Sequence, residues 1–263
     1  MPYVPPISVV VGLVGLCALY VLSIDRYRDR FVGSAPVPAR RQVLFGLAVF
    51  TLLVALATPL DELSDTYLFS AHMLQHLLIT LVAAPLLLAG TPGWLLVELL
   101  RVTHLTRLAQ WALHPLVAFG TFNLIFSMAH VPALYELALG SQPVHAVEHL
   151  VFLVAAIVLW MPILSPAPAL LPRYHGLGQV VYLFLQTVPA SLVGALLAAS
   201  SSPFYPTYIL APRVTSLSPL EDQQAGGLLM WVGSGFYFLV ATGIVFFAWA
   251  SREEAADRRP MRA

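Results

Sequence analysis

The sequence is poor in charge, in cysteine and in lysine. Only 10% of its 263 residues are charged, and every one of its 13 basic residues is arginine. The single cysteine, Cys17, excludes an intramolecular disulfide and a paired-thiol metal site. No phosphate-binding loop, nucleic-acid-binding patch or internal repeat is present. What dominates is apolar: 59% of the residues are hydrophobic, more than a soluble globule of this size can bury.

The apolar residues form long uninterrupted runs. A run of roughly 18 apolar residues can cross a bilayer as a helix, which satisfies its backbone amides within the segment. No alternating pattern suggests a barrel. The sequence therefore predicts an all-α, polytopic membrane protein, a seven-helix bundle forming one transmembrane domain over residues 1–263. The expected helices cover about residues 7–24, 42–58, 70–97, 114–129, 145–162, 177–200 and 226–250.

The arginines are distributed unevenly between the connections. Twelve of the thirteen follow the first, third, fifth or seventh expected helix, and only Arg213 lies in a loop on the other side. Short loops rich in arginine stay in the cytoplasm, so the N-terminus is expected outside and the C-terminus in the cytoplasm of a bacterial plasma (inner) membrane. The arginines follow the first apolar run and do not precede it, so this run is expected to be an uncleaved anchor.

Five of the eight histidines fall at the outer ends of expected helices: His72, His76, His130, His145 and His149. In SAHMLQHLL and VHAVEHLVF the pairs are spaced i, i+4, which brings two imidazoles onto one helix face ~6 Å apart. A single histidine at a helix end is most simply an interfacial, hydrogen-bonded side chain. Two pairs entering the membrane from one side predict a shared metal ion, because ionisable residues there are costly and usually functional.

The neighbouring residues favour copper among the metals that imidazole suits, with zinc as the alternative. Met73, Met128 and Met230 lie near the same side, and a thioether binds cuprous ion better than it binds zinc. Packing is the competing interpretation for all three methionines. Glu148 and Asp222 could bind the ion directly, or orient an imidazole by accepting its second N–H.

Other residues are given ordinary membrane roles. The first outer loop is acidic and is most simply solvated, with attraction of cations as the lesser alternative; its carboxylates are Asp61, Glu62 and Asp65. Trp160 lies near an expected span end, where indole rings prefer the headgroup region. Gly90 begins a Gly-Thr-Pro-Gly stretch that is expected to end or kink the third helix.

Three stretches carry ordered motifs over about residues 68 to 240: AHMLQHLLITLVAAPLLLAGTP, HVPALYELALGSQPVHAVEHLVFLVAAIVLWMPIL and DQQAGGLLMWV. They resemble the CtaG family of cytochrome c oxidase assembly proteins, of the Bacillus type. The resemblance implies a seven-helix protein, not an enzyme, that is needed to make active haem–copper oxidase and has a proposed role in supplying its copper. The matching positions are His72, His76, His130, His145, Glu148, His149, Asp222 and Met230.

The expected partners follow from that implication: cytochrome c oxidase subunits, the surrounding membrane lipid and a periplasmic copper donor, with no nucleic acid. Three other functions compete. An intramembrane zinc hydrolase would use three histidines, a carboxylate and a bound water. A b-type haem protein would use histidines on facing helices, usually at two depths. A scaffolding assembly factor would use its histidines to contact the oxidase without binding metal.

Overall fold

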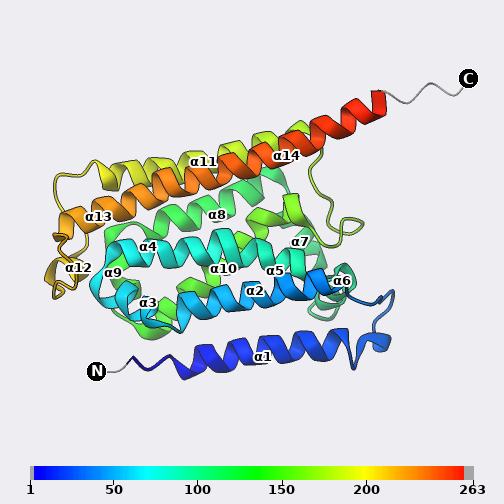
Figure 1. The fold of residues 1–263 in the computed structure, drawn as a ribbon, viewed down its shortest axis with the longest axis horizontal. Helices are drawn as coiled ribbons and strands as arrows, with labels where there is room; N and C mark the ends of the chain where they lie inside the picture. Colours follow the sequence, from blue (N-terminus) through cyan, green and yellow to red (C-terminus); the bar gives the residue numbers. More distant parts are fainter. Residues whose placement is uncertain (1–2, 258–263) are drawn as a thin grey trace, which may run out of the picture.

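The computed structural model describes residues 3–257 as a bundle of roughly parallel and antiparallel helices (Figure 1). The protein is 78% helical, and no strand occurs in the part described. Six spans are long and apolar enough to cross a membrane, and a strongly bent helix pair makes a seventh if it is one span. The expected all-α, polytopic membrane fold is confirmed.

The six spans are α1 (Ile7–Ile24), α2 (Ala39–Leu56), α4 (Phe69–Leu77) with α5 (Ala84–Gly90), α10 (Gln142–Leu164), α11 (Leu177–Ala198), and α13 (Pro219–Leu228) with α14 (Ser234–Asp257). The bent pair is α7 (Thr106–Ala112) with α8 (Pro115–Ala129), which meet at 86°. The short helices are α3 (Pro59–Glu62), α6 (Gly93–Val102), α9 (Pro132–Leu139) and α12 (Pro206–Leu210). A 3₁₀ turn covers Arg28–Arg30, and π-helical turns cover Leu63–Tyr67, Leu78–Ala83 and Leu229–Gly233.

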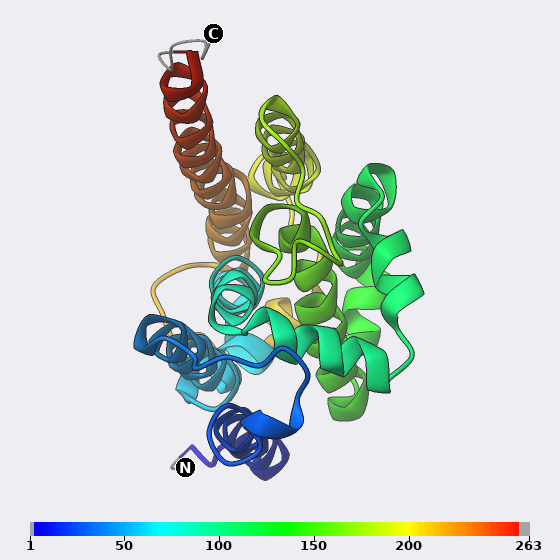
Figure 2. The same ribbon diagram turned by 90° about the vertical axis from the view of Figure 1, so that its right-hand side faces the viewer.

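The α4–α5 span lies inside the bundle. It packs against α2 on one side and α10 on the other, while α11 packs against α8, α13 and α14. Figure 2 views the bundle nearly end-on and places α1 and α14 at opposite edges. The helices α3, α9 and α12 gather at one end, which we call the histidine end, and α6 and α7 lie at the other (Figure 1).

The third expected helix, over 70–97, is longer than the observed span, which ends at Gly90; a separate helix starts at Gly93. Thr91 is extended, with φ −75° and ψ 125°, and the following Pro92 disfavours a helical residue before it. Gly93 also packs tightly, because a Cβ there would lie 2.3 Å from the Pro166 carbonyl oxygen. The break is therefore fixed both by the local sequence and by packing.

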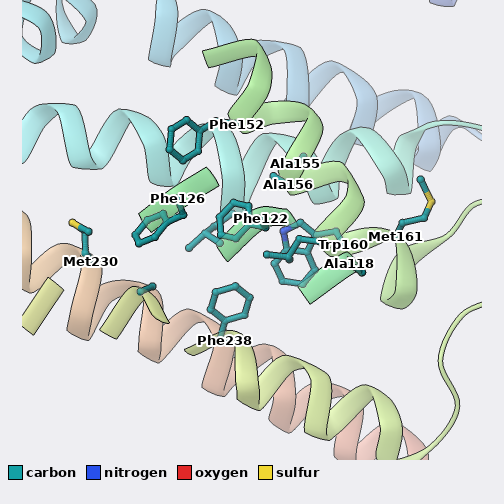
Figure 3. Close-up of a cluster of buried hydrophobic side chains, with 14 of the residues drawn as sticks. Ala118, Phe122, Phe126, Phe152, Ala155, Ala156, Trp160, Met161, Met230 and Phe238 are labelled. Atoms are coloured by element: carbon teal, nitrogen blue, oxygen red, sulfur yellow. The ribbon is translucent and has the colours of Figure 1, made fainter. Parts of the chain in front are cut away.

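Trp160 does not lie at an interface; it is 3% exposed and stacks on Phe238 in the apolar core (Figure 3). Its indole N–H donates to the Thr80 carbonyl oxygen at 3.0 Å. Thr80 lies in a π-helical turn, in which each carbonyl oxygen accepts from the N–H of the residue five positions later. For Thr80 that residue is Pro85, which has no N–H. The indole supplies the donor that the helix lacks.

Orientation in the membrane is tested by reporter fusion. The arginine pattern predicts that a reporter active only in the cytoplasm gives signal when fused after Arg262 and is silent in the loop covering 59–69, because arginine-rich loops resist translocation. The opposite pair of signals would place the histidine end in the cytoplasm and overturn the predicted topology.

Candidate metal centre

Two helices bring four histidine rings together at the histidine end. α4 carries His72 and His76, with ring centroids 4.3 Å apart, and α10 carries His145 and His149, 4.2 Å apart. Between the helices, His72 lies 5.3 Å from His145 and His76 lies 5.4 Å from His149. The i, i+4 spacing aligns each pair on one face, and the packing of α10 against α5 and the π-helical turn Leu78–Ala83, which continue α4, brings the two faces together.

Three of these side chains are close enough to share one ion. His72, His76 and His145 each offer a nitrogen, and the three nitrogens lie within 4.8 Å of one another. The centre of such a triangle is at most ~2.8 Å from each corner, so a small inward rotation of the rings gives the ~2.0–2.1 Å of a zinc–imidazole bond. His149 lies beside this trio as an additional donor.

The ring nitrogens are buried without enough partners. His76 is 4% exposed, and neither of its ring nitrogens has a hydrogen-bond partner among the residues described. The same holds for Nε2 of His145 and Nε2 of His149. A buried polar group left unpaired costs about 1–3 kcal/mol, so a cluster of such groups needs an explanation. A ligand shared by the imidazoles is one.

Two side chains outside the cluster hold its rings in place. The Tyr208 hydroxyl lies 3.2 Å from Nδ1 of His72, and a carboxylate oxygen of Asp65 lies 3.2 Å from Nδ1 of His145. Partners of this kind fix the ring orientation and tautomer of metal-binding histidines. Sequence reasoning missed Tyr208 altogether and treated Asp65 as part of a solvated loop.

Two of the three acids in the first outer loop, Asp61 and Asp65, turn inward, whereas Glu62 is exposed as expected. Asp61 accepts a hydrogen bond from Nε2 of Gln75 at 2.9 Å, and the same amide donates to the Ala55 carbonyl oxygen at 2.8 Å. Burial and the nearby charge of Asp65 raise the pKa of Asp61 to about 6. The signal that could have indicated this is the i, i+4 spacing of Asp61 and Asp65, directly before the first histidine motif.

Glu148 lies on the other side of the His145 ring from Asp65. Its carboxylate oxygen is 3.8 Å from Nε2 of His145, the nitrogen that Asp65 leaves free. Glu148 therefore lies on the side where an ion would bind, which suits the first of its two expected roles, and Asp65 takes the orienting position.

His130 and Met73 contact each other in the structure. Nδ1 of His130 lies 2.6 Å from the Phe126 carbonyl oxygen, and its Nε2 lies 3.4 Å from the Met73 sulfur. Both nitrogens are thus occupied, and the ring contacts that join the other four histidines in the described structure do not include His130. We leave both residues out of the proposed ligand set.

Asp222 and Met230 are held in structural surroundings. The buried Asp222 carboxylate accepts from the backbone N–H groups of Phe69 and Ser70 and from the Ser70 hydroxyl, so it caps the start of α4. Met230 belongs to the apolar core (Figure 3). Gly226 allows α13 to approach α4, because a Cβ there would lie 2.4 Å from the Phe69 ring. The DQQAGG motif thus positions α4.

The fold and the cluster together define a polytopic helical membrane protein with a buried imidazole centre at one end. The family model for the cytochrome c oxidase caa3 assembly factor (Caa3_CtaG) matches residues 18–252. The chain belongs to this family, as its motifs indicated, and is a cytochrome c oxidase assembly factor by that membership. Comparisons with curated proteins and with solved structures gave no match.

Proposed function

We propose that this chain binds a copper ion at His72, His76 and His145 and delivers it to cytochrome c oxidase during assembly. The observation that carries the proposal is the trio of buried imidazole nitrogens within 4.8 Å, with both nitrogens of His76 unpaired. Family membership supplies the oxidase as the recipient. The C-terminus lies in the cytoplasm and the histidine end outside, in the bacterial inner membrane.

The donor set suits an ion that must be passed on. Neutral imidazoles bind copper and zinc alike, and the oxidase as recipient favours copper. His149 and Glu148 lie beside the trio and offer further donors, so ligands can exchange while the ion moves. A closed four-ligand site, by contrast, serves structure and does not release its metal readily.

An intramembrane metal hydrolase is the second candidate, favoured by one observation. A cavity of about 470 Å³, lined largely by apolar side chains, reaches His145 and His149. Three histidines, a carboxylate and a water would suffice for hydrolysis. The family points to a non-catalytic role instead. A hydrolase assay on zinc-loaded and copper-loaded protein, with amide-linked lipids as substrates, separates the two functions.

The delivery proposal is tested in cells that lack this chain. Wild-type protein should restore copper-loaded, active oxidase, whereas His72→Ala/His76→Ala should leave oxidase subunits present but copper-deficient and largely inactive. Added copper should restore part of the activity by an unassisted route. Normal oxidase copper in cells carrying this variant would contradict delivery from the histidine centre, and a loss of subunits with normal copper per subunit would support a scaffold.

A further inference from the structure

The cavity beside the histidines lies along the first half of α1. Ser8, Val9, Gly12 and Leu16 of α1 line it together with Leu52 of α2 and the α10 residues His145 and His149. At the other end, α1 is fastened to the bundle: Tyr20 stacks on Phe45 at 3.7 Å and donates to the Gly90 carbonyl oxygen. This cavity therefore lies between α1 and the bundle at the histidine end.

A second cavity of about 430 Å³ adjoins the first and is acidic. Its lining includes Tyr3, Asp61, Glu62 and Asp65, and among residues 3–257 no arginine or histidine lines it. Asp61 and Asp65 line both cavities, as do Pro6 and Gln142, so the two cavities are neighbours that share these residues. We call the second cavity the acidic vestibule.

The two cavities differ in the donor atoms that line them. His145 and His149 are 5% and 9% exposed, line the inner cavity, and each keep a buried Nε2 without a hydrogen-bond partner in the described structure. Asp65 lies between the vestibule acids and the histidines. One of its oxygens contacts His145, and its other oxygen is buried without a partner in the described structure. Carboxylate oxygens therefore line the vestibule, imidazole nitrogens line the inner cavity, and Asp65 lies between them.

We propose that the acidic vestibule is a transit site for the metal cation, through which it reaches and leaves the histidine centre. The inference rests on the proposed function. Carboxylates attract a cation strongly but hold a soft ion less well than imidazole does, so the ion passes through the vestibule and comes to rest on the histidines. A lining with one sign of charge also raises the local concentration of the opposite ion and its rate of association, by ~10 to 10³-fold.

The test measures the rate of copper loading of the full chain in detergent. Free copper ions are mixed rapidly with the protein, the reaction is stopped with excess chelator at set times, and bound copper is counted. Asp61→Asn/Glu62→Gln removes two vestibule charges and leaves Asp65 on His145; the asparagine can still accept from Gln75. We expect loading to slow by about tenfold at low salt and to reach the same final stoichiometry.

The matched control is Glu136→Gln/Glu221→Gln, which removes two charges from α9 and α13 outside the vestibule lining. It should load at the wild-type rate. Equal rates for the vestibule variant and wild type would overturn the transit site while leaving the proposed function standing, and so would equal slowing in both double variants. Loss of stoichiometric copper in the vestibule variant would also overturn it, by making the acids part of the resting site. Metal-free wild-type protein would overturn both proposals.

Discussion

Replacing His72 and His76 together, or His145 and His149 together, with alanine should abolish stoichiometric copper binding. Each double change removes at least one member of the trio and the donor one turn away on the same helix. The loss should exceed the ~10 to 100-fold fall in affinity that accompanies removal of an orienting partner. Insertion should be unaffected, because removing polar groups from an apolar helix lowers its transfer cost.

Affinity is measured by competition with a chelator of known strength, and insertion by the amount of protein in washed membranes. His114→Ala/His175→Ala is the matched control, since it removes two histidines that lie outside the cluster. It should bind copper like the wild type. Full copper occupancy in both cluster variants would show that the ion is held elsewhere and would contradict the histidine centre.

His76→Leu should make the metal-free protein more stable while removing its response to copper. Both ring nitrogens of His76 are buried and find no partner within residues 3–257, and the ring packs on Phe152 at 4.5 Å. Leucine is of similar size and keeps the apolar contact with Phe152. It also removes the unpaired nitrogens, whose burial costs about 1–3 kcal/mol. Thermal melts in detergent should show a higher midpoint than wild type without copper, and no further rise on adding it.

His130→Leu is the contrasting variant at the same end of the bundle. It breaks the contact between Nδ1 and the Phe126 carbonyl oxygen, so it should lower the midpoint of the metal-free protein. Wild-type protein should gain stability with copper, since a ligand that binds only the folded state stabilises it. A metal-free His76→Leu protein less stable than the wild type would contradict this account. It would mean that His76 contributes packing that leucine cannot replace, and that its unpaired nitrogens do not destabilise the metal-free protein.

The fold was predictable because a membrane span depends on the apolar residues of one continuous segment. Uninterrupted apolar runs gave six spans, and the least regular of the expected seven, over 114–129, became the bent pair. The helix ends were less predictable. Pro92 and Gly93 divided the third expected helix, whereas the last span begins at Pro219, well before the expected 226, because Ser218 and Glu221 form a capping box ahead of the apolar run.

The histidines could be found from sequence, and their partners could not. The i, i+4 rule places two imidazoles on one helix face, and two pairs at one depth suggest convergence. The contact of Tyr208 with His72 joins residues 136 positions apart, and no local sequence pattern predicts it. Asp222 shows the converse: a buried carboxylate in a matching motif looked like a ligand, but it caps a helix.

Elemental analysis of the purified wild-type protein after copper loading tests the central claim most directly. We expect about one copper per chain after excess and loosely bound metal have been washed away, and copper in preference to zinc when both are offered in equal amounts. Protein that emerges free of metal, with the fold intact, would contradict the copper centre and leave the histidines a role in contacting the oxidase.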